Sequence, residues 1–121
     1  MVFAPRLAAA DHLARHRLAD LFLDTVPVNA HTTASEALWT GCPVLTIAGG
    51  TFVSRVAGSL LRTLGLPELI ATSLDEYAAL ALRLATEPEQ LAQLRARLQT
   101  NRATSPLFDA RQFAGPLEQA Y

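Results

Sequence analysis

Short apolar runs recur along the chain and predict the strands of a sheet. They stand at Val2–Ala4, Leu21–Leu23, Val44–Ile47 and Leu69–Ala71. Most of these runs do not alternate with charged residues, which is typical of strands buried on both faces of a parallel sheet. Pro5 follows the first run directly, so we expect only a stub of strand there.

Between the runs, apolar residues recur at helical spacing and predict helices. We expect helix starts at Asp11, at Thr32 or Thr33, at Ser54, and at two S/T-x-x-E capping boxes, Ser73–Glu76 and Thr86–Glu89, with Gly41 and Gly65 as helix ends. The expected core positions of the last two helices are Leu74, Tyr77, Leu80, Ala81, Leu84, Leu91, Leu94 and Leu98.

This order of elements indicates an α/β fold, Rossmann-like, with helices on both faces of a parallel sheet in three layers. Three or four predicted strands fall below the roughly five to six of a typical sheet. We therefore expect residues 1–121 to form a single partial domain whose sheet is incomplete.

Composition narrows the classes of function. Half of the 121 residues are hydrophobic, so a folded core is expected. The apolar runs are too short to cross a bilayer, and the N-terminus lacks a secretory signal, so we expect a cytoplasmic protein without a membrane partner. The net charge of -1, with acidic and basic residues interspersed, predicts no nucleic-acid partner.

Reactive side chains are few. The chain contains ten arginines and no lysine. This excludes any mechanism that needs a lysine from this chain, such as a Schiff base or a lysine that clamps a phosphate. The single cysteine, Cys42, has no partner at zinc-ligand spacing, and we expect a buried, inert thiol. Asp24 has no second carboxylate at useful spacing, so we interpret it as structural. The sequence predicts no metal ligand, no cofactor and no catalytic residue.

A candidate binding site follows the second apolar run. After Leu21–Leu23 the chain turns through a loop with Pro27 and Asn29, and a helix is predicted to start at Thr32 or Thr33. Ligands of open α/β sheets bind beyond the carboxyl ends of the strands, where free amides at a helix start attract anions. His31, Thr32 and Thr33 are therefore candidates for binding phosphate.

Several segments together are similar to a known family: Asp11–Thr25, Asn29–Trp39, Ser54–Ala57, Gly65–Ile70 and Ser105–Asp109. They resemble the C-terminal catalytic lobe of the O-linked N-acetylglucosamine transferase and SPINDLY family. The resemblance implies a GT-B fold, in which two Rossmann-like domains face each other, usually preceded by tetratricopeptide repeats. It also implies transfer of a sugar from a nucleotide sugar to Ser or Thr hydroxyls of proteins.

The resemblance assigns roles to particular positions. His31, Thr32 and Thr33 correspond to the diphosphate site, and Glu36 to an acidic residue that hydrogen-bonds the ribose. His12 corresponds to a histidine near the nucleotide and Arg15 to a base contact. Backbone groups near Leu7 correspond to the segment that pairs with the base edge.

The family pattern is not complete in this chain. Ala9 stands where some members have a lysine over the ribose, and the Gln and Lys that help to hold the diphosphate belong to a segment upstream of Met1. By the same resemblance, we expect the facing domain, which supplies most of the acceptor site in the family, to lie outside these 121 residues. Partners expected are a nucleotide sugar, a protein acceptor in the intact enzyme, and either a second copy or the missing N-terminal half.

Alternatives remain open for several residues. Glu36 also fits a Thr33-x-x-Glu36 capping box, in which it binds its own helix amides. We interpret His16 as solvated, Trp39 as a core anchor and Gly49-Gly50 as a turn. UDP-N-acetylglucosamine is the expected donor, with GDP-fucose or UDP-glucose as alternatives. A non-catalytic remnant or interaction module is the alternative of another class.

Overall fold

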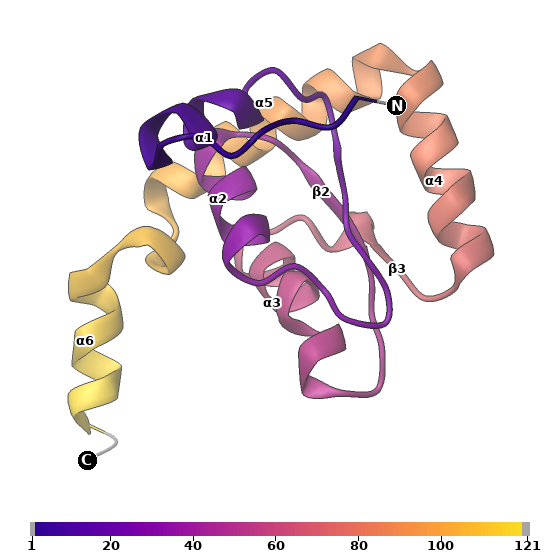
Figure 1. Ribbon diagram of the computed structural model, residues 1–121. Coiled ribbons are helices and arrows are strands. Elements are labelled where there is room, and N and C mark those ends of the chain that lie inside the picture. Colours follow the sequence, from indigo (N-terminus) through magenta and orange to yellow (C-terminus); the bar gives the residue numbers. More distant parts are fainter. Residues whose placement is uncertain (1, 120–121) are drawn as a thin grey trace.

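Three short parallel strands form the sheet in a computed structural model that describes residues 2–119 (Figure 1). The strands β1 (Phe22–Leu23), β2 (Val44–Ile47) and β3 (Ile70–Ala71) lie in the order β1-β2-β3. Phe22 pairs with Val44, and Thr46 pairs with Ile70. Three of the four predicted runs are therefore strands. The prediction for Val2–Ala4 is wrong: that segment is exposed and pairs with no strand of the described residues.

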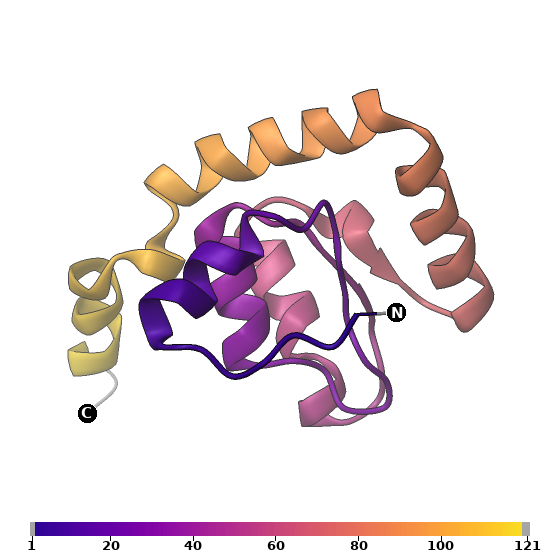
Figure 2. The ribbon, with the colours of Figure 1, turned by 45° about the horizontal axis from the view of Figure 1, so that its top comes forward.

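Helices cover the sheet on both sides. They are α1 (Ala9–His16), α2 (Thr32–Thr40), α3 (Val56–Thr63), α4 (Leu74–Thr86), α5 (Pro88–Thr104) and α6 (Ala110–Gln119), with 3-10 turns η1 (Phe52–Ser54), η2 (Pro67–Leu69) and η3 (Pro106–Phe108). In Figures 1 and 2, α2 and α3 lie on one side of the strands and α4 on the other, while α5 crosses above them. This arrangement confirms the predicted Rossmann-like three-layer α/β/α class.

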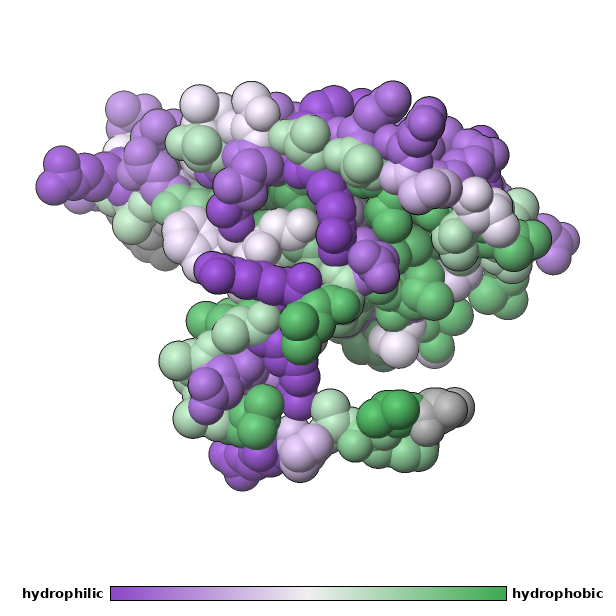
Figure 3. All heavy atoms as spheres, turned by 90° about the horizontal axis from the view of Figure 1, so that it is seen from above, coloured by the Kyte–Doolittle hydropathy of each residue, from purple (hydrophilic) through white to green (hydrophobic). Residues whose placement is uncertain are grey.

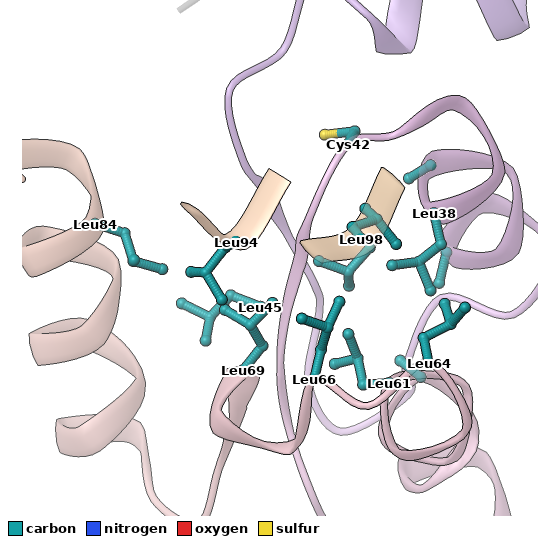
Figure 4. Packing of buried hydrophobic residues seen from close by; sticks show 14 of the residues in the cluster. Leu38, Cys42, Leu45, Leu61, Leu64, Leu66, Leu69, Leu84, Leu94 and Leu98 are labelled. Atoms are coloured by element: carbon teal, nitrogen blue, oxygen red, sulfur yellow. The ribbon is translucent and has the colours of Figure 1, made fainter. Parts of the chain in front are cut away.

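Leucines from every layer meet in the core (Figure 4). Leu45 of β2 lies between Leu84 of α4 and Leu38 of α2, and Leu94 and Leu98 of α5 belong to the same cluster. The predicted core positions Leu80, Leu84, Leu94 and Leu98 are buried, and Tyr77 and Ala81 pack against the core. Leu74 is a wrong prediction, because its side chain is 65% exposed.

Glycine ends two helices because the backbone there needs a positive φ. Gly41 closes α2 at φ 90°, and Gly65 follows α3 at φ 68°. Only glycine adopts this region without steric cost. Both predicted helix ends are thus found within two residues. The neighbouring Cys42 is buried as expected, and burial raises the pKa of its thiol.

Two predicted helix starts are displaced. The helix expected from Asp11 begins at Ala9, and Asp11 lies in its first turn, where a negative charge is favourable. The helix expected from Ser54 begins at Val56. The Ser54 hydroxyl instead forms a capping box with Thr51 around η1.

The capping box expected at Thr86 does not form. Thr86 is the last residue of α4, and its hydroxyl donates to the carbonyl oxygen of Leu82 at 3.0 Å. The next helix, α5, begins at Pro88. Proline suits the first helical position because its missing N–H has no partner there in any case. A proline therefore sets this helix start, and Thr86 does not cap it.

Trp39 is not a core anchor, since its side chain is 51% exposed. The indole lies against the Phe108 ring, with 5.1 Å between the ring centroids, and the Arg102 guanidinium lies over it at 5.9 Å. The adjacent Ala37 and Leu38 face the core instead.

The side of the molecule that α5 covers is largely hydrophilic, with hydrophobic patches beside it (Figure 3). Within residues 2–119, no helix is both long enough and apolar enough to span a membrane.

Candidate nucleotide site at the start of helix α2

A buried carboxylate fixes the loop that leads from β1 into α2. Asp24 is only 6% exposed and lies directly after β1. Its Oδ1 accepts hydrogen bonds from the backbone N–H groups of Thr25 (2.8 Å) and Ala30 (2.6 Å), and its Oδ2 accepts from the Thr46 hydroxyl (2.6 Å). All of its partners are donors within the fold. These contacts give Asp24 the structural role that we expected.

Two further side chains hold the same loop, and the sequence reasoning missed both as loop anchors. Asn29 is buried, and its Nδ2 donates to the carbonyl oxygens of Thr25 (3.3 Å) and Ile47 (3.5 Å). The Tyr77 hydroxyl donates to the carbonyl oxygen of Asp24 at 2.9 Å. Burial, and secondarily the nearby Asp24, raises the pKa of Tyr77. The loop is thus fastened to β2 and to α4.

The N-terminus of α2 is open to solvent. The helix begins at Thr32, as one of the two predicted starts, and His31 precedes it with no side-chain hydrogen bond to the helix amides. His31, Thr32 and Thr33 are all exposed. No acidic residue lies in the first turn. Uncapped amides and the positive end of the helix dipole make such a terminus attractive to an anion.

Glu36 points away from its own helix amides and toward α1. Its Oε2 lies 3.4 Å from Nε2 of His12, which comes from the adjacent helix. The capping box considered for Thr33 and Glu36 is not formed. It would require Thr33 to be the residue that caps the helix, whereas α2 begins at Thr32 and His31 stands at the cap position without a capping hydrogen bond. The carboxylate is therefore available to a group outside α2.

Arg15 determines which nitrogen of His12 carries the proton. The Nη2 of Arg15 lies 2.8 Å from Nδ1 of His12, and its Nη1 donates to the carbonyl oxygen of Pro5 at 2.9 Å. A guanidinium only donates hydrogen bonds, so Nδ1 accepts and the proton of neutral His12 lies on Nε2, facing Glu36. The structure therefore brings three predicted site residues, His12, Arg15 and Glu36, into one cluster.

His16 completes this cluster, although we expected it to be solvated. Its ring packs edge-on against His12 with 4.9 Å between the centroids, and the two Nε2 atoms are 3.4 Å apart. The pKa of His16 is lowered, first by burial and then by the neighbouring His12, while Glu36 acts in the opposite direction. The spacing of four between the histidines was the available signal, because such residues share one helix face.

The remaining predicted residue, Leu7, lies on the exposed segment before α1. The hydrogen bond from Arg15 to Pro5 ties this segment to α1. On the other side of the site, the His31 ring lies edge-on to Phe52 with 6.2 Å between the centroids. Leu7 thus lies on the segment that is tied to α1, and Phe52 lies against the residue that precedes α2.

Gly49 follows β2 and needs to be small for packing. A Cβ at this position would lie 2.6 Å from Cβ of Ser54, which is closer than folded proteins tolerate. The Gly49 N–H also donates to the carbonyl oxygen of Ser54 at 2.9 Å. Gly49 and Gly50 therefore form the turn that we expected, and Gly49 packs tightly against η1.

A parallel α/β sheet with a helix start beyond its first strand is the arrangement of a Rossmann-like domain. The sequence profile of glycosyl transferase family 41 matches residues 1–117. The chain therefore belongs to glycosyl transferase family 41.

Similar proteins carry transferase names. The chain is 42% identical over 118 residues to a UDP-N-acetylglucosamine–peptide N-acetylglucosaminyltransferase of Caenorhabditis elegans, covering 98% of this chain and 10% of the relative. It is 41% identical over 111 residues to the "Probable UDP-N-acetylglucosamine–peptide N-acetylglucosaminyltransferase SPINDLY" of Petunia hybrida, covering 92% of this chain and 12% of the relative.

A solved structure shares the fold. A mutant of the Thermobaculum terrenum O-GlcNAc transferase superposes with a TM-score of 0.87 at 38% identity, covering 95% of this chain and 22% of that one. The chain thus spans about a tenth of the length of these curated relatives and about a fifth of the length of the solved structure.

Proposed function

We propose that residues 1–121 form the C-terminal part of the nucleotide-sugar-binding lobe of a protein O-glycosyltransferase. The proposed reaction transfers N-acetylglucosamine from UDP-N-acetylglucosamine to Ser or Thr hydroxyls of proteins. The observation that carries the proposal is the uncapped start of α2 with Glu36, one turn further on, held beside His12 and Arg15. The names of the relatives support the choice of donor and acceptor.

The diphosphate belongs at the start of α2. The N–H groups of Thr32 and Thr33 and the imidazole of His31 would donate hydrogen bonds to its oxygens, and the helix dipole adds the equivalent of about half a positive charge. In a direct displacement with inversion at the anomeric carbon, negative charge builds up on the departing diphosphate. Donors fixed before the reaction stabilise that charge without reorganisation.

The nucleoside belongs beside α1. Glu36 would accept hydrogen bonds from ribose hydroxyls, and His12 orients its carboxylate from 3.4 Å away. Arg15 and the backbone near Leu7 would contact the base. The hydrogen bond from Arg15 to Pro5 supports this assignment, because it ties the Leu7 segment to the same cluster.

The rest of the enzyme would supply the facing domain, the acceptor site and further strands of the sheet. The small share of each relative that this chain covers supports this division. GDP-fucose and UDP-glucose are the competing donors: GDP-fucose differs from UDP-N-acetylglucosamine in both base and sugar, and UDP-glucose differs in the sugar alone.

Calorimetric titration of the 121-residue chain tests the proposal. We expect saturable binding of UDP in preference to GDP. A His31→Ala, Glu36→Ala double variant should bind UDP at least about 10-fold more weakly, since two hydrogen bonds of about 1 kcal/mol or more are lost. Glu89→Ala, an exposed change on α5, is the matched control. Equal affinity of the double variant and the control would overturn the assigned site, provided that circular dichroism shows all three chains folded.

A further inference from the structure

Two imidazoles and one carboxylate converge between α1 and α2. His12 and His16 lie four residues apart on α1, and Glu36 reaches them from α2. The Nε2 of His12 is 3.4 Å from Nε2 of His16 and 3.4 Å from Oε2 of Glu36. The three ligand atoms lie within 4.8 Å of one another, and all three residues are half-buried.

These separations match the ligand shell of a small divalent cation. Zinc lies about 2.0–2.1 Å from an imidazole nitrogen or a carboxylate oxygen, so two neighbouring tetrahedral ligands are about 3.4 Å apart. Two edges of the His12, His16 and Glu36 triangle already have that length. The third edge, between His16 and Glu36, is no longer than 4.8 Å, a gap that rotation of the half-buried Glu36 carboxylate can close.

We propose that His12, His16 and Glu36 bind one divalent cation of the borderline class, with Zn²⁺ as the representative ion and water completing the shell. Imidazole nitrogen suits Zn²⁺, Ni²⁺ and Co²⁺, and two imidazoles with one carboxylate leave a coordination position open. Sequence spacing alone missed this site, because the carboxylate lies 20 residues beyond the second histidine. His16 has no part in the nucleotide site proposed above, so the inference goes beyond that function.

Arg15 should lower the affinity of this site for a metal ion. In the metal-free chain it donates to Nδ1 of His12, so the His12 proton lies on Nε2. A metal on Nε2 requires this proton to move to Nδ1, with no net gain or loss, and Arg15 must then release Nδ1. An acceptor at position 15 would instead receive the new Nδ1–H, as the other ring nitrogen of a metal-bound histidine usually requires.

Metal and nucleotide would exclude each other. This consequence rests on the proposed function, because His12 and Glu36 serve both ligands. A cation bound to Glu36 would occupy the oxygens proposed for the ribose. Metal binding would therefore lower the affinity for UDP, whereas UDP would displace the metal.

The test uses the chain without a polyhistidine tag, titrated with Co²⁺ and followed by the visible absorption of the bound ion, and then with Zn²⁺ in competition. We expect one ion per chain. His16→Ala removes a ligand and should weaken metal binding by at least about 10- to 100-fold, because loss of a residue that merely hydrogen-bonds to a ligand already has an effect of that size. His31→Ala, the third histidine of the chain, is the matched control and should leave metal binding unchanged. Arg15→Gln should bind the metal more tightly.

The outcomes separate this inference from the nucleotide site. His16→Ala should lose the metal and retain UDP, whereas His31→Ala should retain the metal and bind UDP more weakly. Absence of saturable Co²⁺ binding overturns the metal site, as does an equal loss in His16→Ala and His31→Ala. Neither result affects UDP binding, which is measured in a separate metal-free titration.

Discussion

The hydroxyl of Tyr77 donates a hydrogen bond to the carbonyl oxygen of Asp24, 53 residues earlier in the chain, at 2.9 Å. This bond joins α4 to the loop that carries the candidate site. Tyr77→Phe removes it and leaves the carbonyl oxygen of the buried Asp24 without this donor. We expect the free energy of unfolding to fall by about 0.5–1.5 kcal/mol, as for one net hydrogen bond. Urea unfolding measures the change. Thr63→Ala removes an exposed hydroxyl of α3 and should cost less than about 0.5 kcal/mol.

The Asp24 carboxylate organises the loop more strongly than Tyr77 does. Asp24→Ala leaves the N–H groups of Thr25 and Ala30 without their acceptor. Each hydrogen bond to a charged group is worth about 1.5–3 kcal/mol, so the variant should lose about 3 kcal/mol or more. Thr46→Val removes only the third donor and should cost less than half as much. If unfolding in urea gives equal losses for the two variants, the amide contacts do not fix the loop.

Two adjacent glycines should respond differently to the same substitution. Gly49→Ala places a Cβ 2.6 Å from Cβ of buried Ser54, and strain of this kind costs about 1–3 kcal/mol. At Gly50 no atom lies within 4 Å of the added Cβ, and the backbone there has no positive φ. Gly50→Ala should therefore be neutral, or stabilise the fold by up to about 1 kcal/mol through the unfolded state. Thermal unfolding of the pair measures both changes. A larger loss at Gly50 would contradict the packing described for η1.

Stability should depend on pH through Glu76. The hydroxyl and the N–H of Thr72 both donate to its carboxylate, and they lower the pKa of Glu76. A lowered folded-state pKa means that the contribution to stability is present above the unfolded pKa and is lost as the pH falls through the folded pKa. The difference in unfolding free energy between the chain and Glu76→Gln should therefore be present at neutral pH and vanish in acid. In a Thr72→Val background, without the hydroxyl donor, the difference at neutral pH should shrink.

Local patterns predicted the features that neighbouring residues determine. The run Val44–Ile47 is a strand, and Gly41 ends its helix, because burial and positive φ are properties of those residues. Thr86 failed as a cap because Pro88 starts the next helix more favourably. His16 was misplaced because its burial comes from packing against His12 in the folded cluster.

Contacts between residues far apart in the chain are not indicated by local sequence patterns. The hydrogen bond from Tyr77 to Asp24 joins residues whose proximity depends on the whole sheet, and no spacing in the sequence indicates it. At the candidate site, the predicted helix start indicated His31, Thr32 and Thr33, and the resemblance added His12, Arg15, Glu36 and Leu7. The orientation of Glu36 toward His12 came only from the structure. Composition and periodicity fix the class of fold, whereas contacts between elements fix the site.

The two halves of the candidate site should separate when ligands are shortened. Glu36 is assigned to the ribose, so Glu36→Ala should weaken uridine and UDP by the same factor, about 10-fold for a charged hydrogen bond. His31 is assigned to the diphosphate, so His31→Ala should weaken UDP and leave uridine unchanged. Competition calorimetry gives both factors, and Glu89→Ala again serves as the control. If Glu36→Ala weakened only UDP, the carboxylate would act on the diphosphate side, and the proposed orientation of the nucleotide along α2 would be reversed.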